Sequence, residues 1–165
     1  MTTRVLTLVT SVALISTACY VGDEPLSPPV ATRDARILGE WRCVSPAPDG
    51  DEPAVIRVTP FESVGYDLEF GERGKDTDRY RGYSSLVSGH VVLNLQEVHD
   101  GKVNRAWMFA RYDLLQPNVV QVRLIADRLL KTLDSPKAVT EAIRRNIENS
   151  DLYDDFCVCV RVQSK

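Results

Sequence analysis

Short segments of alternating apolar and polar residues, each ended by turn-forming residues, constrain the fold of this chain more than any other feature. In the stretch Ile37–Cys43, Trp41 and Cys43 fall on one face of an extended strand, and charged residues fall on the other. Tyr66–Phe70 alternates in the same way, with two carboxylates on its outer face. The pattern predicts a mainly β protein.

Seven segments of this kind follow one another with short connections, which predicts an antiparallel meander, and an eighth follows later in the chain. At about eight strands a meander closes into a barrel and so removes its own exposed edges. We therefore expect a single β-barrel domain over residues 37–163. The predicted strands are Ile37–Ser45, Ala54–Thr59, Tyr66–Phe70, Arg79–Leu86, Val91–Val98, Arg105–Leu115, Val119–Ile125 and Phe156–Val162.

The hydrophobic period changes before the last predicted strand. Asp127–Leu133 is typical of a short helical segment. Ser135-Pro136 is typical of a helix start, because serine caps the free N–H groups and proline suits the first helical position. The apolar residues that follow share one helical face. The sequence thus predicts a helical insert before the last strand.

Closure of the barrel pairs the first strand with the last, and the cysteines test the register. If Cys43 lies opposite Cys159, then Trp41 lies opposite Arg161, and a guanidinium over an indole contributes about 0.5–2 kcal/mol. The rival register, with Cys43 opposite Cys157, offers no such pair. We favour the first register, which predicts a disulfide between Cys43 and Cys159 and a structural Trp41–Arg161 pair.

The two faces of the last strand leave a question open. Val158, Val160 and Val162 look like the core face, whereas the favoured disulfide requires Cys159 to face the same way as Trp41. The alternative is that the valines pack outward beneath the helix. The sequence alone does not decide between these arrangements, nor between Cys157 and Cys159 as the partner of Cys43.

The amino-terminal residues have the character of an export signal. Arg4 precedes an apolar run, Val5–Ile15, which is shorter than the roughly 20 residues of a permanent transmembrane helix. The run ends in Ser16-Thr17-Ala18 before Cys19. These small residues before a cysteine resemble the lipobox of bacterial lipoprotein precursors, although that family usually has an aliphatic residue in place of Ser16. An ordinary signal peptide, cleaved at the same small residues, is the alternative.

The lipoprotein resemblance implies that residues 1–18 are removed and that Cys19 carries acyl chains such as palmitate. Two or more chains anchor a protein stably, because each buried methylene contributes about 0.8 kcal/mol. Tyr20 stands where an aspartate retains members of that family at the inner membrane, so the resemblance implies an outer-membrane lipoprotein facing the periplasm or the cell surface. We interpret residues 19–36, which are rich in proline, as a tether that holds the domain off the lipid.

The motif Gly39-x-Trp41 on a first strand, with strands, a helix and a last strand following it, resembles the lipocalins and the wider calycin group. In that group the tryptophan plugs one end of the barrel and an arginine from a late strand packs over it. The family's strand order would make this arginine Arg123, whereas the register above makes it Arg161. The resemblance implies a cavity for a small hydrophobic ligand or lipid, and a side-chain-filled interior is the alternative. The candidate ligand-lining residues are Tyr66, Phe70, Tyr80, Met108 and Tyr112.

The remaining features point to no catalytic or metal centre. The net charge of -3 argues against a general nucleic-acid binder. Both histidines, His90 and His99, lie in predicted turns, and the Cys157-x-Cys159 spacing is not that of a zinc or redox pair. We therefore predict that the protein is not an enzyme and needs no cofactor or metal.

Two hypotheses for function follow from these observations. In the first, a lipid-anchored cell-envelope protein carries a non-enzymatic structural or protein-interaction β-barrel. In the second, a lipocalin-like carrier binds a small hydrophobic ligand. A cavity of several hundred cubic ångströms would favour the carrier. A packed interior with an exposed apolar strip, for which Trp107 and Phe109 are the candidates, would favour the interaction module.

Overall fold

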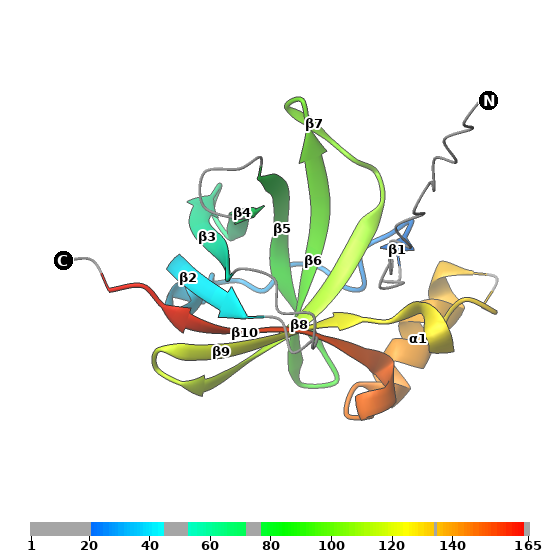
Figure 1. Ribbon diagram of the computed structural model, residues 1–165. Coiled ribbons are helices and arrows are strands. Elements are labelled where there is room, and N and C mark those ends of the chain that lie inside the picture. Colours follow the sequence, from blue (N-terminus) through cyan, green and yellow to red (C-terminus); the bar gives the residue numbers. More distant parts are fainter. Residues whose placement is uncertain (1–20, 45–52, 72–76, 134, 164–165) are drawn as a thin grey trace, which may run out of the picture.

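The computed structural model describes residues 21–44, 53–71, 77–133 and 135–163 (Figure 1). The predicted export signal and the predicted acylation site, Cys19, lie outside the described residues. Within the described part of the chain, no helix has both the length and the apolar character needed to cross a membrane.

Eight antiparallel strands form a closed barrel, as the sequence predicted. Each barrel strand pairs with the next one along the chain, β6 pairs with β8, and β10 returns to pair with β2. The barrel is therefore a simple meander whose first and last strands form the closing seam. Its strands are β2 (Gly39–Val44), β3 (Ala54–Phe61), β4 (Gly65–Gly71), β5 (Asp78–Val87), β6 (His90–His99), β8 (Trp107–Gln116), β9 (Val119–Ile125) and β10 (Tyr153–Arg161).

Smaller elements surround the barrel. A short strand, β1, lies along the start of β8, and β7 forms a hairpin with the end of β6. The single α-helix of the described chain precedes β10 and lies beside β1 on one side of the barrel (Figure 1). These elements are β1 (Val21–Gly22), η1 (Ala35–Ile37), β7 (Lys102–Val103), η2 (Asp127–Leu129), α1 (Pro136–Asn146) and η3 (Ser150–Leu152).

The helix begins as its sequence predicts. The Ser135 hydroxyl accepts a hydrogen bond from the Ala138 N–H at 3.3 Å, and Pro136 is the first helical residue. Val139 and Ile143 are buried. The two arginines of the last turn stabilise the helix, because their positive charge lies at the negative end of the helix dipole. The helix therefore has a capping residue at its start and an apolar face along its length. A helix this short is only marginally stable by itself, so it depends on packing against the barrel wall.

Two tight hairpins show the turn chemistry of the sequence directly. Ser88 and Gly89 connect β5 to β6, and Asp100 and Gly101 connect β6 to β7. All four residues have positive φ, between 50° and 83°. This conformation matches the right-handed twist of the flanking strands, and the Asp-Gly pair is one of its strongest sequence signals.

The closing seam has the register that the sequence favoured. Cys159 pairs with Cys43 and Arg161 pairs with Trp41, both across the antiparallel β10–β2 ladder. The first indole and the last guanidinium of the barrel are therefore neighbours. The barrel closes through residues that are more than one hundred positions apart in the chain.

The hydrophobic residues form two cores, one on each side of the barrel wall. The interior core is built around Trp41 and the inward-facing residues of all eight strands. The second core lies outside the wall, where α1, η3 and Leu26 pack against β6, β8 and β9. Because β6 contributes to both cores, its run Val92–Leu95 is buried on both faces, and a charged residue does not alternate with the apolar ones there.

The valines of the last strand do not face the core, and they do not lie beneath the helix. Val158, Val160 and Val162 are 36%, 51% and 41% exposed, whereas Cys157 and Cys159 are buried in the interior. Alternation along a strand shows that its two faces differ, but the register to the neighbouring strands decides which face is inside. Here the pairing of Cys159 with Cys43 turns the valines outward.

The segment predicted to be a tether also differs from expectation. From Val21 onward the chain lies against the barrel, beginning with the pairing of β1 with Met108 and Trp107. Composition misled the prediction because a proline-rich, non-periodic segment cannot form a core of its own, yet it can be held by hydrogen bonds to groups supplied elsewhere.

Charged residues alternate across the outer face of four neighbouring strands. Glu40, Arg57, Glu69 and Arg79 lie directly opposite one another from β2 to β5. Arg57 bonds both glutamates at 3.2 Å, and Arg79 pairs with Asp67. The Arg79 hydrogen bond lowers the pKa of the Asp67 carboxyl. Exposed pairs such as these contribute little stability individually, but opposite charges in register favour the native pairing over a slipped one.

Candidate functional site

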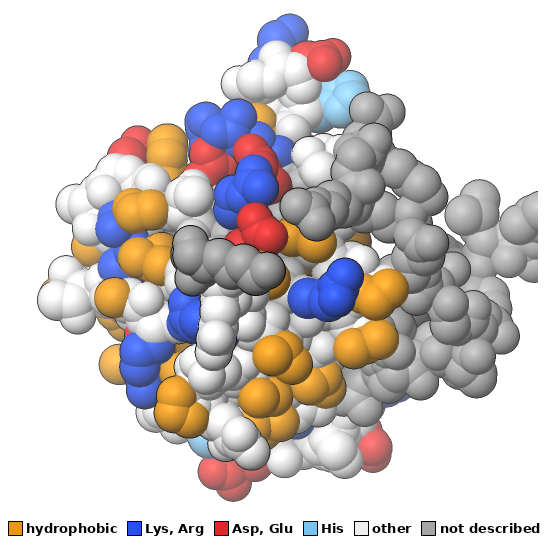
Figure 2. Space-filling view, turned by 60° about the vertical axis from the view of Figure 1, so that its left-hand side comes forward, with side chains coloured by type: hydrophobic (Ala, Val, Ile, Leu, Met, Phe, Trp, Pro, Cys, Tyr) orange, Lys and Arg blue, Asp and Glu red, His pale blue; other side chains and the backbone are white. Residues whose placement is uncertain are grey.

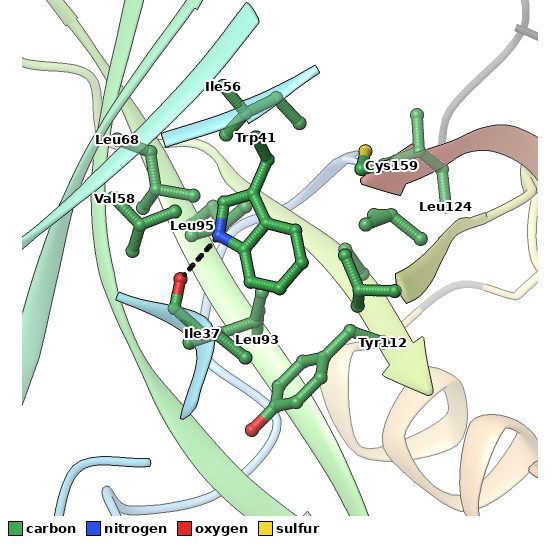
Figure 3. Close-up of a pocket in the computed structure, with 13 residues that line it drawn as sticks. Ile37, Trp41, Ile56, Val58, Leu68, Leu93, Leu95, Tyr112, Leu124 and Cys159 are labelled. Atoms are coloured by element: carbon green, nitrogen blue, oxygen red, sulfur yellow. Dashed lines mark hydrogen bonds between the residues drawn. The ribbon is translucent and has the colours of Figure 1, made fainter. Parts of the chain in front are cut away.

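One end of the barrel interior is filled by Trp41. Its side chain is 2% exposed, and its indole N–H donates to the Ile37 carbonyl at 2.9 Å (Figure 3). The Arg161 guanidinium carbon lies 4.2 Å from the centre of the ring. The arginine over the indole is the one that the seam register predicted, Arg161, and not the one that the lipocalin strand order implied.

Arg161 also joins the seam to the segment that precedes β2. It donates to the Leu38 carbonyl at 2.6 Å and to the Arg36 carbonyl. Gly39 makes room for it: the Gly39 φ is +120°, and a Cβ there would lie 2.9 Å from the Arg161 Nη1. The glycine of the Gly-x-Trp motif is thus explained by the close approach of the guanidinium.

Arg123, which the lipocalin strand order would place over the indole, lies on the outer wall. Its guanidinium carbon is 4.8 Å from the centre of the Tyr153 ring, and it forms an ion pair with Asp113. The cation–π contact of Trp41 therefore comes from Arg161 and not from Arg123.

The interior contains a small apolar cavity of about 80 Å³ (Figure 3). Pockets for drug-sized ligands usually measure about 300–1,000 Å³. The cavity therefore reflects incomplete packing of an interior that is otherwise filled by side chains. Its lining residues are Ile37, Trp41, Ile56, Val58, Leu68, Leu93, Leu95, Ala110, Tyr112, Val120, Val122, Leu124 and Cys159.

Among the candidate ligand-lining residues, Tyr112 lines this cavity. Tyr66 is fully buried, but its hydroxyl receives hydrogen bonds from the Asp34 N–H and from Ser84 at the edge of the core. Tyr80 and Met108 pack against the interior core without lining the cavity, and Phe70 is half-buried beyond it. Sequence alternation identified inward-facing positions but not their depth along the barrel.

Three cysteines meet beside the closing seam. Cys43 and Cys159 form a disulfide with an S–S distance of 2.03 Å, and the Cys157 thiol lies 3.4 Å from the Cys159 sulfur. The three sulfurs lie within 4.8 Å of one another, which is close enough for a metal site. Two of them are joined to each other, however, and metal coordination requires thiolates. The arrangement is therefore a structural staple with a buried thiol beside it.

Cys157 is expected to resist alkylation in the folded protein. Burial raises the pKa of its thiol from 9.0 to about 12, so the reactive thiolate is scarce at neutral and mildly alkaline pH. Iodoacetamide labelling at about pH 8.5, followed by mass spectrometry, should modify Cys157 quickly in urea and slowly in buffer. Rapid modification in buffer would contradict the buried position.

The same shift has a consequence for stability at high pH. Because the unfolded thiol loses its proton before the folded one, the stability that Cys157 contributes is complete below about pH 9 and is lost as the pH rises toward 12.

No family model matches this chain, and searches of curated proteins and of solved structures found no match. The site must therefore be interpreted from its own geometry.

The outer face of the closing seam carries an exposed apolar strip. We call Val44, Val158, Val160 and Val162 the valine strip. Val44 is 53% exposed and lies directly opposite Val158. On the β9 side, Val160 pairs with the half-buried Val119. On the β2 side, Val160 pairs with the exposed Arg42. Figure 2 shows hydrophobic side chains gathered on this part of the surface, below a band of alternating acidic and basic side chains.

The sequence placed an apolar strip at Trp107 and Phe109, but Phe109 is buried and Trp107 is half-buried. Phe109 is 1% exposed within the core beneath α1, and Trp107 packs at its margin with an edge-on contact to Tyr83. The signal for the valine strip was present in the sequence as the alternation of Val158, Val160 and Val162. The alternation did not show which face points outward, and the structure shows that the valines do.

The two histidines lie on the surface. His90 Nε2 is 3.3 Å from Glu148, and His99 is paired with Asp100 in the β6–β7 hairpin. Neither lines the interior cavity.

Proposed function

We propose that this protein is a non-enzymatic, lipid-anchored cell-envelope protein whose barrel binds another protein through the valine strip. The anchor is Cys19, acylated after removal of residues 1–18, and the location is the outer membrane. No cofactor or nucleic acid takes part. The observation that carries the proposal is a group of four exposed valines on the outer face of the seam, whereas other exposed large hydrophobic residues of the barrel, such as Leu86 and Leu115, belong to other strands.

The geometry favours an interaction module over a carrier for two reasons. The interior cavity, about 80 Å³, is too small for a fatty acid or a comparable lipid. The seam that carries the valine strip is also cross-linked, because it has both the disulfide and the Arg161 contacts. A rigid surface loses little conformational entropy on binding, which improves affinity for a given contact area.

The partner is expected to be recognised mainly through apolar contact. The exposed Arg42 beside Val160 and the Gln121 beside Val158 provide a polar rim. An apolar centre with a polar rim is the usual anatomy of a protein–protein interface.

Site-specific photocrosslinking in living cells tests this proposal. A benzophenone amino acid at Val160 should give a discrete crosslinked product, and the same amino acid at Leu86 should not. Leu86 is the matched control because it is an apolar residue of another strand with a similar exposure, 55% against 51%. Mass spectrometry of the product identifies the partner.

The crosslink at Val160 should disappear when Val44→Lys and Val158→Lys are added, because a lysine charge at the centre of an apolar interface is costly to desolvate. The exposed positions predict a change in folding stability within about 0.5 kcal/mol, which circular dichroism during urea unfolding would check. Equal crosslinking from Val160 and Leu86 would reject the valine strip as the binding face.

A further inference from the structure

The chain immediately after the proposed acylation site is part of the fold. Val21 and Gly22 form β1 and pair with β8. Four residues further on, Leu26 is 7% exposed, and its N–H donates to the Oδ1 of the fully buried Asn94 at 2.9 Å. The Asn94 amide in turn donates to the Ser85 hydroxyl at 2.8 Å. Both polar groups of the Asn94 side chain thus have hydrogen-bond partners. This fixes the segment firmly, because its release would leave the buried Asn94 oxygen without a partner.

The segment remains attached over the rest of its length. The Val30 N–H donates to the Ser84 carbonyl at 2.9 Å. Arg33 donates to the carbonyls of Gly65 and Glu62, each at 2.7 Å. Residues 21–36 therefore run along the outer wall from β8 to the β3–β4 turn, with attachments throughout.

Asp34 completes the attachment at the end of the barrel. Its N–H donates to the Tyr66 hydroxyl at 2.8 Å, and its carboxylate accepts from the Tyr112 hydroxyl at 2.9 Å. The Arg36 hydrogen bond lowers the pKa of the Asp34 carboxyl, which keeps it ionised as an acceptor. The side chain of Tyr112 that reaches the cavity thus also binds the incoming segment.

This attachment leaves almost no spacer between an acylated Cys19 and the barrel. Only Tyr20 lies between Cys19 and Val21, and two steps of extended chain at about 3.3–3.6 Å each span at most about 7 Å. The anchor must therefore emerge from the side of the barrel that carries β1 and α1 (Figure 1).

The valine strip lies on the other side. Val160 pairs with Val119 of β9, and Val119 pairs with Gln116 of β8, so Val160 and Gln116 lie at the same level of the barrel. Gln116 is at the opposite end of β8 from Trp107, which pairs with β1. Nine residues of strand separate these two levels, about 30 Å at 3.3 Å per residue, and the strip lies two and three strands further around the barrel. Figure 1 shows β1 beside α1, and β2 with the end of β10 on the opposite side.

We infer that the acylated protein is held with its β1–α1 side directly on the lipid surface, so that the valine strip faces the aqueous compartment. The inference rests on the anchoring in the proposed function and adds an orientation to it. An apolar strip that faces away from the bilayer cannot serve to insert into lipid. Its occupant is therefore a protein of the aqueous compartment, reached without any movement of the barrel on a tether.

Tryptophan quenching in vesicles tests the orientation. The acylated protein is reconstituted into vesicles of phosphatidylethanolamine and phosphatidylglycerol that contain a lipid with a nitroxide in its headgroup. Trp107 lies beside β1 and is the natural reporter. The buried Trp41 adds a background fluorescence, which the Trp107→Phe variant measures by itself. Val160→Trp in the Trp107→Phe chain reports on the valine strip.

We expect a several-fold steeper dependence of quenching on nitroxide content for Trp107 than for Val160→Trp. Val162→Trp is a second reporter in case Val160→Trp perturbs the seam. A Gly-Ser insert of about ten residues between Tyr20 and Val21, with an end-to-end distance near 18 Å, should abolish the difference. Equal quenching of both reporters without the insert, or quenching of neither, would overturn the orientation.

Flotation of the vesicles separates this result from failure of the anchor. Cys19→Ala protein is expected to stay in the soluble fraction while the natural chain floats. If both chains float equally, acylation is not the anchor, and the proposed function and the orientation fail together. If only the natural chain floats and the reporters are quenched equally, the orientation alone fails.

Discussion

Trp41→Ala is expected to lower the free energy of unfolding by about 3–5 kcal/mol, the range measured when large buried aromatic side chains are removed. Trp41 is 2% exposed and already lines the interior cavity, so its removal enlarges a void that the surrounding strands have not collapsed to fill. The substitution also leaves the Ile37 carbonyl without its indole donor and removes the ring beneath Arg161. A typical domain is stable by only about 5–15 kcal/mol, so the loss is a large part of the total.

The measurement is urea unfolding followed by far-ultraviolet circular dichroism, because the substitution changes the fluorescence signal itself. Trp107→Ala is the matched control, since it deletes the same side chain from a half-buried position on the outer wall. We expect a smaller loss for Trp107→Ala, because the outer site can relax toward solvent. Equal losses for the two variants would contradict the role of Trp41 as the plug of the barrel.

Removal of the disulfide is expected to destabilise the protein by about 2–5 kcal/mol. The bond joins residues 116 positions apart, so the chain-entropy relation gives a value near the upper end, about 5 kcal/mol. The appropriate variant is Cys43→Ala with Cys159→Ala, because a single substitution leaves a thiol that can pair with the neighbouring Cys157. The seam keeps its backbone ladder in this variant, so we expect a weaker barrel and not an open one.

Cys157→Ala is the matched control for the disulfide variant. It removes a buried thiol from the same strand but leaves the Cys43–Cys159 bond in place. Its loss should be that of a small buried side chain, about 1 kcal/mol. Unfolding in urea, with and without a reductant, compares the three proteins. A loss for Cys157→Ala as large as that for the double variant would show that packing, and not the cross-link, supports the seam.

The comparison of sequence and structure is most informative at the seam. Trp41 and Cys43 are two residues apart on one strand, and Arg161 and Cys159 are two residues apart on the other. In an antiparallel ladder, the register that aligns Cys43 with Cys159 also aligns Trp41 with Arg161, and the adjacent registers align neither pair. The residue numbers were therefore enough to predict the contact between Trp41 and Arg161. The prediction succeeded because two pairs of residues, one of cysteines and one of a tryptophan with an arginine, constrained a single unknown, the register.

The face of the valines could not be obtained in the same way. In Cys157–Val160 both faces consist of residues that are common in protein interiors, so the alternation does not show which face points inward. In addition, a register shift interrupts the β9–β10 ladder between Asp155 and Cys157. A bulge moves one residue out of phase, so strand parity cannot be extended along the chain from β9 or from the helix.

Local sequence determined the strands, the two tight hairpins and the capped helix, because their alternation, turn residues and capping residues act over a few positions of chain. It also determined the seam register, through residue types that have few good partners. Only the tertiary structure decided that residues 21–36 lie along the barrel and that the valine strip faces outward. Those outcomes depend on Asn94, Tyr66 and Cys43, which are distant in sequence, and hydrogen bonds or covalent bonds between distant residues leave no periodic trace in either segment.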